Sequence, residues 1–313
     1  MHLFTYLAGD QAVPGRQVGT LGIDIHLAVQ AFCSAYPEEC RNLPSNPVSL
    51  LDWLGLKSEG LQLIQKSTDW ILEQYLKVEE SLWQEGMVFE LETAFLQAPI
   101  PNPGKVICIA GNYPAPGKIE KPEHPTVFLK PSSGVTGDNQ PLVIPALAQN
   151  VAYEVELAVI IGSRGRHLSS ENAASCIAGY TIANDVGDRI LEKRTTQWTS
   201  GKMFDTFTPM GPVLVTPDDL KQTNALEMVT KVNGQIVQHG STALMFFDIP
   251  QLIGLLSELT TLLPGDVILS GSPKLMGDTP NPTIAIKPGD FVEVSIEPLG
   301  TLSNPAIAEG QTL

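Results

Sequence analysis

Apolar and polar residues alternate in the middle of the chain in a pattern that predicts two neighbouring β-strands. In the run VAYEVELAVII (residues 151–161), alternate apolar positions face a core, whereas Glu154 and Glu156 both face the opposite side. Residues 179–186 form a second apolar run, and the serine that opens residues 169–178 predicts a short capped helix between the two runs. This order of strand, helix and strand can bring the end of the second strand beside the start of the first.

The first hundred residues show a mixed pattern. Residues 3–8 and 19–24 predict a pair of strands, and residues 25–32 predict a short helix. In residues 61–83, apolar side chains recur at helical spacing opposite a charged face. These residues therefore predict a long amphipathic helix whose apolar stripe packs on a core.

A cluster of proline and glycine at residues 99–104 predicts a boundary between two domains. We therefore expect a smaller N-terminal α/β domain, residues 1–100, and a larger domain, residues 101–313, in which short strands alternate with turns. An alternating run at residues 287–296 predicts another strand near the end of the chain.

Three carboxylates stand where the two central strands are expected to meet. Glu154 and Glu156 share one side of the first strand, and Asp185 lies at the polar end of the second. Like charges this close, flanked by apolar residues, repel each other unless a cation or a proton neutralises them. Oxygen ligands without cysteine or histidine favour Mg²⁺, Mn²⁺ or Ca²⁺ over Zn²⁺. A sheet with one solvated face, on which alternating glutamates are ordinary, is the alternative interpretation.

Seven segments of the larger domain form a recognisable series: VICIAGNY (106–113), VFLKPSS (127–133), YEVEL (153–157), GYTIAND (179–185), QW with GKMFDTF (197–207), VNG (232–234) and LPGDVILSGSP (263–273). In this order and spacing, residues 105–305 resemble the catalytic domain of the fumarylacetoacetate hydrolase superfamily. The resemblance implies an α+β fold, mostly β, in which a mixed β-roll carries the catalytic site and usually forms homodimers.

The resemblance assigns roles to individual residues. It makes Glu154, Glu156 and Asp185, hereafter the carboxylate triad, the metal ligands. It places Lys202 beside the metal as a catalytic residue that holds a substrate oxygen. It places Ser272 where relatives usually carry a threonine that meets the substrate carboxylate.

Further assignments from the resemblance concern the surroundings of the metal. Arg189 matches a family arginine, which we expect either to act in catalysis or to form an ion pair with the triad. Tyr113 and Gln197 belong to matching segments and are expected to bind substrate. Glu192 is also expected to bind substrate, because it stands where relatives often carry a glutamine. Gly187 and Asp188 replace a serine and an alanine of the family pattern.

The sequence departs from the family most clearly in a short lid. Many relatives carry a histidine and a glutamate there that orient a water or act as the base, but this chain has Pro116 and Ile119. The prolines and glycine of this segment disfavour a helix. Glu120, one residue from the expected carboxylate, and His239, near a segment that borders the pocket, are the candidate replacements.

Composition is consistent with a water-soluble enzyme. The chain has 313 residues, of which 43% are hydrophobic, and it contains no apolar run of about 20 residues that would span a membrane. The cytoplasm is the expected location, because the first residues do not resemble a signal peptide. Four cysteines show no metal-ligand spacing, although Cys33 and Cys40 are close enough in sequence to form a disulfide under oxidising conditions.

A formal net charge of −15 argues against nucleic acid as a partner. Lys130, Lys202 and Arg189, together with the metal, would have to attract an anionic substrate locally. We expect a Mg²⁺- or Mn²⁺-dependent hydrolase that cleaves a C–C bond of a small 2-oxo or 1,3-diketo carboxylic acid, acting as a homodimer. The alternatives are a decarboxylase or enol–keto isomerase acting on the same substrates, and a catalytically silent metal-binding homologue.

Overall fold

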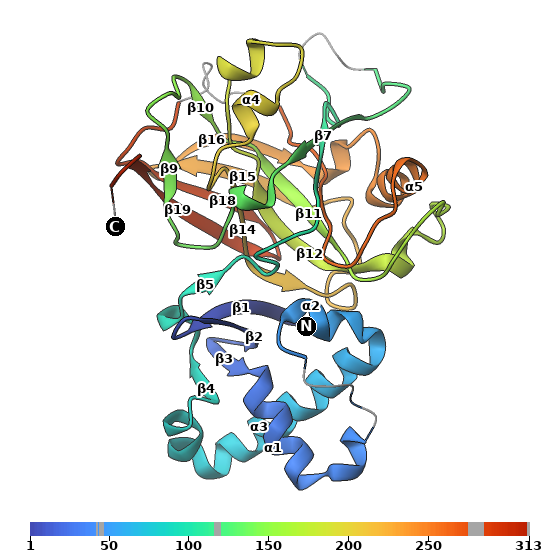
Figure 1. Cartoon of the computed structure of the whole chain (residues 1–313), viewed down its shortest axis with the longest axis vertical. Helices are drawn as coiled ribbons and strands as arrows, with labels where there is room; N and C mark the ends of the chain where they lie inside the picture. The colour runs from blue at the N-terminus through green and yellow to red at the C-terminus, as the bar shows by residue number, and fades with distance from the viewer. Residues whose placement is uncertain (42, 44–46, 116–119, 275–284, 312–313) are drawn as a thin grey trace.

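The computed structural model describes residues 1–41, 43, 47–115, 120–274 and 285–311. Its helices are α1 (Ile25–Ala35), α2 (Leu50–Gly55), α3 (Lys57–Gln84), α4 (Thr199–Lys202) and α5 (Ile249–Leu259). Figure 1 shows α1 and α3 toward one end of the molecule, α2 beside β1 nearer the middle, and α4 toward the other end.

A mixed sheet runs through the described part of the chain. Strand β1 (His2–Ala8) pairs with β14, so the N-terminal strands and the later strands belong to the same sheet. The boundary between domains near residue 100 stays a prediction. The order of the sheet is β4 (Val88–Glu90), β3 (Leu21–Asp24), β2 (Gln11–Val18), β1, β14 (Thr208–Val215), β12 (Ile177–Asn184), β11 (Val155–Ile161), β17 (Val267–Leu269), β6 (Val106–Ala110) and β7 (Thr126–Lys130), with β5 (Leu96–Gln97) beside β1 and β8 (Val135–Thr136) beside β14.

Two smaller sheets complete the fold. The short pair of β10 (Val151–Ala152) and β13 (Gly187–Asp188) lies next to the triad in sequence. The other sheet has the order β16 (Gln235–Ser241), β15 (Glu227–Val232), β18 (Phe291–Ile296), β19 (Gly300–Ala308) and β9 (Leu142–Ile144). The predicted fold class, α+β with mostly β structure, is confirmed.

Strand β11 is buried on both faces. Val155, Leu157, Val159 and Ile161 lie in one hydrophobic cluster, which confirms the predicted core face. The opposite face, which carries Glu156, packs through Ala158 and Ile160 into a second cluster with Leu3 and Ile25 of the N-terminal part. A solvated face therefore does not explain the alternating glutamates.

The long predicted strand at residues 151–161 is divided in two. Tyr153 and Glu154 lie between β10 and β11 because the strand ladder is interrupted by a side chain: the Glu154 N–H donates to Asn184 Oδ1 at 3.0 Å. At the start of β11, the Val155 N–H donates to Gln238 Oε1 at 3.1 Å. Side-chain acceptors thus satisfy the backbone where regular pairing stops.

Two other local predictions were wrong. The strands at residues 3–8 and 19–24 do not pair with each other, since β2 lies between them and pairs with both. Pro14 and Gly15 concealed β2, because both residues are unfavourable in strand interiors. The helix predicted at residues 169–178 is only a 3₁₀ helix, η4 (Ala173–Cys176), whose Asn172 N-cap makes no side-chain bond. The Cys176 carbonyl instead accepts the Gly162 N–H at 2.7 Å, which turns the chain into β12.

The remaining predicted elements are present. The helices expected at residues 25–32 and 61–83 correspond to α1 and α3, and the strand expected at residues 287–296 corresponds to β18. Cys33 and Cys40 form a disulfide between α1 and the 3₁₀ helix η1 (Pro37–Cys40). Among the helices of the described residues, none has the length and apolar character needed to cross a membrane. The cytoplasmic location stays a prediction.

Candidate active site

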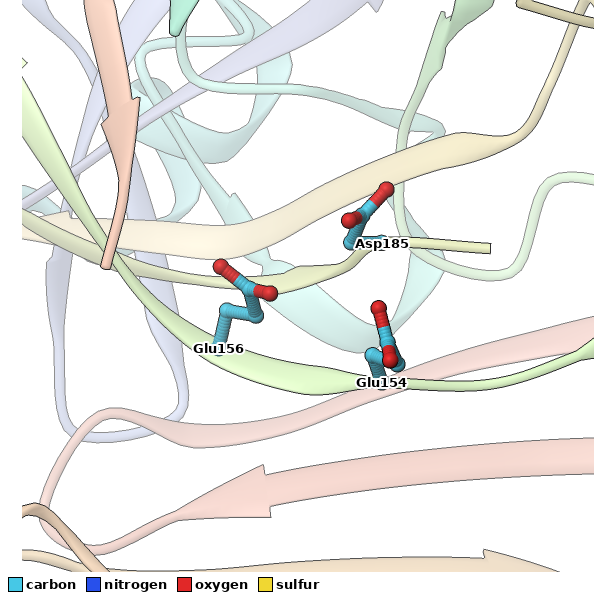
Figure 2. Close-up of side chains that lie close together, drawn as sticks. All are labelled: Glu154, Glu156 and Asp185. Atoms are coloured by element: carbon cyan, nitrogen blue, oxygen red, sulfur yellow. The ribbon is translucent and has the colours of Figure 1, made fainter. Parts of the chain in front are cut away.

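Antiparallel pairing of β11 with β12 assembles the carboxylate triad. Val155 at the start of β11 lies opposite Asn184 at the end of β12, so Glu154 and Asp185 are neighbours across the two strands. The Asp185 N–H donates to the Glu154 carbonyl at 2.9 Å. One carboxylate oxygen from each of Glu154, Glu156 and Asp185 lies within 4.8 Å of the other two. Figure 2 shows the three side chains gathered around one space.

Lys202 lies against two members of the triad. Its Nζ donates to Glu154 Oε2 at 2.7 Å, to Asp185 Oδ2 at 2.8 Å and to the Asp185 carbonyl at 3.0 Å. The side chain comes from the end of α4 and is buried. Although burial by itself lowers the pKa of Lys202, the charges of Asp185 and Glu154 outweigh it and raise the pKa. Lys202 therefore remains a cation and a hydrogen-bond donor.

Lys130, at the end of β7, holds the other oxygen of Asp185. Its Nζ donates to Asp185 Oδ1 at 2.6 Å, and to the carbonyls of Val186 and Phe207 at 2.9 and 2.6 Å. Three acceptors use all three donors of the ammonium group. Lys130 is therefore committed to fixing Asp185 and the backbone after it.

Two further cations contact Glu154. Arg189, which follows β13, donates from Nη2 to Glu154 Oε1 at 2.7 Å and from Nη1 to Glu192 at 3.1 and 3.2 Å. Lys274 Nζ lies 3.4 Å from Glu154 Oε1, and its side chain is about half exposed. The structure thus brings Arg189, Lys202 and Glu192 to the triad, as the sequence predicted, and adds Lys274.

The two glutamates of the triad differ in their charge environment. Burial acts to raise the pKa of Glu154, but the charges of Lys202, Arg189 and Lys274 outweigh burial and hold this pKa well below its usual range. Burial raises the pKa of Glu156 well above its usual range, and the charges of Asp185 and Glu154 raise it further. The Gly271 N–H donates to Glu156 Oε2 at 2.7 Å, but no cationic side chain of the described residues forms an ion pair with Glu156.

The triad has the chemistry of a site for a hard divalent cation. It offers only carboxylate oxygens, which are the ligands that Mg²⁺, Mn²⁺ and Ca²⁺ prefer. Burial and then the charges of Asp185 and Glu154 raise the pKa of Glu156, and no lysine or arginine of the described residues forms an ion pair with it. A cation beside Glu156 would supply the missing charge, so the residues fit a divalent metal.

A pocket of about 280 Å³ opens onto the triad. Phe128 and Trp198 form an apolar wall, and their rings pack edge to face with centroids 5.7 Å apart. Charged residues also line the pocket, and Lys202 Nζ lies 5.7 Å from the centroid of the Phe128 ring. The full lining is Ile109, Ala110, Gly111, Thr126, Phe128, Glu154, Glu156, Asp185, Arg189, Glu192, Trp198, Lys202, Ser272 and Lys274.

Ser272 lines this pocket and is held by a neighbouring strand. Gln238 of β16 donates from Nε2 to Ser272 Oγ at 2.8 Å and to the Pro273 carbonyl at 2.7 Å. Because Ser272 Oγ accepts from the amide, its own hydrogen is available to a ligand. Gln238 also accepts from Thr230 Oγ1 at 2.8 Å, which fixes the orientation of its amide.

Four residues predicted from the sequence lie away from the pocket. Tyr113 is buried and its hydroxyl donates to Met228 Sδ at 3.3 Å. Gln197 is exposed after Thr195, and Glu120 is also exposed. His239 points from β16 toward Glu227, with its Nε2 2.8 Å from Glu227 Oε2. None of the four lines the pocket in the described part of the chain. Pro116 and Ile119, the positions of the predicted lid, are not among the described residues.

Sequence reasoning missed Lys274 and Gln238. Lys274 follows the Ser272–Pro273 turn directly, so its proximity to the pocket was a usable signal once Ser272 had been assigned. Gln238 gave no comparable signal, because its role depends on β16 lying near the start of β11.

The chain matches known proteins over most of its length. It is 40% identical over 221 residues to the human mitochondrial oxaloacetate tautomerase FAHD2A, a match that covers 69% of this chain and 70% of that protein. It is 41% identical over 228 residues to oxaloacetate tautomerase YisK of Bacillus subtilis strain 168, covering 70% of this chain and 75% of that protein.

Solved structures and a family profile agree with these matches. The maleylpyruvate hydrolase of Sphingobium sp. SYK-6, solved with manganese(II) and pyruvate, superposes with a TM-score of 0.70 at 26% identity, covering 99% of this chain and 100% of that one. Residues 105–307 match the profile of the fumarylacetoacetate (FAA) hydrolase C-terminal domain. The chain therefore belongs to the fumarylacetoacetate hydrolase family.

Proposed function

We propose that this protein is a divalent-metal-dependent tautomerase that interconverts the keto and enol forms of a small 2-oxo dicarboxylic acid, with oxaloacetate as the first candidate. The observation that carries the proposal is the pocket itself. It combines a hard-oxygen metal site with three cationic side chains, Arg189, Lys202 and Lys274. Two relatives at about 40% identity are named oxaloacetate tautomerases, which supports this substrate.

The triad would hold Mg²⁺ or Mn²⁺. Manganese in the maleylpyruvate hydrolase structure supports this choice of ion. When bound, the ion would act as a Lewis acid that stabilises negative charge on substrate oxygens. The carboxylates need fixed positions to bind the ion, and Lys130, Lys202 and Arg189 provide them through their hydrogen bonds.

The other pocket residues would bind and orient the substrate. Lys202 presents a permanent positive charge beside the triad, where it stabilises an enolate oxygen. The Ser272 hydroxyl donates toward a substrate carboxylate, with its orientation set by Gln238. Lys274 has a more exposed side chain than Arg189 or Lys202, and it would bind the second carboxylate of a dicarboxylic acid. Phe128 and Trp198 reduce access of water to the enolate.

Tautomerisation fits this pocket better than the C–C hydrolysis expected first. Hydrolysis requires a water activated by a base, and histidine most often takes that role. No histidine lines the pocket among the described residues. Keto–enol exchange requires enolate stabilisation and one proton transfer at carbon, which a charged pocket with a carboxylate can provide.

Rates on two substrates in one preparation test the proposal. With Mn²⁺ present, the protein should speed the approach of oxaloacetate to its keto–enol equilibrium, followed by ultraviolet absorbance, and EDTA should abolish the effect. Hydrolysis of acetylpyruvate should be slow, because general acid–base groups commonly contribute about 10²- to 10⁴-fold. Fast acetylpyruvate hydrolysis without tautomerase activity would instead establish the hydrolase. The predicted homodimer and the absence of nucleic-acid partners stay predictions.

A further inference from the structure

Glu192 is the pocket carboxylate that the metal site does not use. Four carboxylates line the pocket among the described residues, and three of them form the triad. The other charged lining residues, Arg189, Lys202 and Lys274, are cations. Arg189 and Lys202 use their hydrogens as donors to Glu154 and Asp185, and Lys274 lies against Glu154 at the pocket edge. Glu192 thus remains as a candidate proton acceptor.

Glu192 is connected to the triad through a shared cation, because Arg189 contacts both Glu192 and Glu154. It belongs to the 3₁₀ helix η5 (Leu191–Lys193) and is 8% exposed, so it is shielded from bulk water. Arg189 Nη1 contacts both Glu192 oxygens, at 3.2 and 3.1 Å, while Nη2 of the same guanidinium binds Glu154. Lys202 Nζ, which binds Glu154 and Asp185, lies 3.9 Å from Glu192 Oε1.

Two glycines make the space that Glu192 occupies. A Cβ atom at Gly187 would overlap Glu192 Oε1, and a Cβ atom at Gly201 would lie 2.7 Å from Glu192 Cγ. Both approaches are shorter than van der Waals contact permits. The missing side chain at 187 therefore accommodates the carboxylate of Glu192.

We propose that Glu192 is the catalytic base that moves the proton at C3 of the substrate. This inference rests on the proposed tautomerase function. In the keto-to-enol direction, the Glu192 carboxylate removes a proton from C3, the C–H electron pair forms the C2=C3 bond, and the carbonyl π electrons move to the oxygen. The enolate oxygen then takes a proton from water, and Glu192 returns its proton to the resulting hydroxide. Arg189 and Lys202 face the carboxylate, with Arg189 Nη1 3.1 Å and Lys202 Nζ 3.9 Å from its oxygens.

Glu192→Gln tests the assignment with little change in shape. Tautomerase kcat should fall about 10²- to 10⁴-fold while the Kd for Mn²⁺ and KM change less than about threefold. Glu192→Asp should retain part of the activity. Glu171→Gln, an exposed glutamate outside the pocket, is the matched control and should behave as wild type. A Glu192→Gln protein with wild-type kcat would overturn the proposal.

Isotope exchange and chemical rescue separate a base from a positioning residue. Wild-type protein with Mn²⁺ should exchange the methyl hydrogens of pyruvate in D₂O, observed by proton NMR, and Glu192→Gln should not. Formate should restore exchange in Glu192→Ala, because a small carboxylate can enter the vacated space. Exchange that persists in both variants would refute the role of Glu192. Absence of exchange and tautomerisation in the wild type would refute the proposed function itself, and this inference with it.

A binding measurement gives a readout that does not depend on turnover. Oxalate has the charges and oxygen arrangement of pyruvate enolate, so a base beside it should carry the abstracted proton. Calorimetry in two buffers of different ionisation enthalpy should therefore show uptake of close to one proton when oxalate binds the Mn²⁺-loaded wild type. The uptake should disappear in Glu192→Gln. Equal proton uptake by both proteins would contradict the proposal.

Discussion

The pocket and the hairpin formed by β15 and β16 both contain a close pair of a basic and an acidic side chain, but in different surroundings. Lys202 and Asp185 lie 2.8 Å apart with side chains 4% and 2% exposed. His239 and Glu227 also lie 2.8 Å apart, with side chains 53% and 60% exposed. An exposed pair contributes about 0–1 kcal/mol because water and salt screen it, whereas charges removed from water depend strongly on their partners.

A residue buried in the pocket is a better candidate for catalysis than an exposed residue that is close to a family motif in the sequence. His239 was attractive in the sequence because a histidine can act as a base near neutral pH. The structure directs it to a solvated glutamate away from the pocket. Glu192, which the sequence assigns only to substrate binding, lies inside the pocket and close to the cations that hold the triad.

The largest effect is expected from Lys202→Met. This change leaves Glu154 and Asp185 buried with fewer cations, and loss of one partner from a buried pair typically costs about 3–5 kcal/mol. Denaturant unfolding of the metal-free protein should show a loss of this size, and tautomerase activity should also fall. Lys193→Met, on the surface nearby, is the control. Unchanged stability would show that water reaches this site and screens its charges.

Removal of a triad ligand ranks second. Glu156→Ala should weaken Mn²⁺ binding by about tenfold or more, because two carboxylates then share the ion with water. Calorimetric titration measures this directly, and Glu258→Ala on the exposed face of α5 should bind as wild type. Equal affinity in Glu156→Ala would place the metal elsewhere.

The pH dependence of Mn²⁺ binding sharpens the contrast between the two glutamates of the triad. The raised pKa of Glu156 means that a proton competes with the ion, so affinity should fall as pH decreases through this raised pKa. The lowered pKa of Glu154 means that its carboxylate stays ionised over the same interval. Glu156→Gln should therefore bind weakly, with a flatter pH profile. A wild-type affinity for Mn²⁺ that does not fall as the pH is lowered would contradict this sign.

A smaller effect is expected from Lys274→Met. A half-exposed charge contributes about 1 kcal/mol, so KM for oxaloacetate should rise roughly fivefold. Pyruvate, which lacks the second carboxylate, should bind the variant and the wild type alike in calorimetry. If both ligands weaken equally, Lys274 acts on Glu154 rather than on the substrate.

The smallest effect is expected from His239→Gln. Because His239 and Glu227 are exposed and outside the pocket, kcat, KM and stability should all stay within about 0.5 kcal/mol of wild type. Steady-state rates and thermal unfolding measure this. A loss of activity in His239→Gln would overturn the contrast between the two regions and would return His239 to the list of candidate bases.

Much of the site could be predicted from the local pattern of apolar and polar residues in the sequence. Alternation along residues 151–161 placed Val155 and Leu157 in the core and singled out the two glutamates, because successive side chains of a strand face opposite ways. Spacing to the next apolar run then identified Asp185. The amphipathic periodicity that predicted α3 was equally local.

Tertiary structure decided which neighbours those residues meet. Antiparallel pairing of β11 and β12 set Glu154 beside Asp185, and β7, β16 and the turn after β17 contributed Lys130, Gln238 and Lys274. Tertiary structure likewise directed Tyr113 to Met228 and placed Glu192 in the space beside Gly187. The physical reason is that side-chain alternation depends on adjacent residues, whereas strand pairing and burial depend on contacts between residues far apart in the chain.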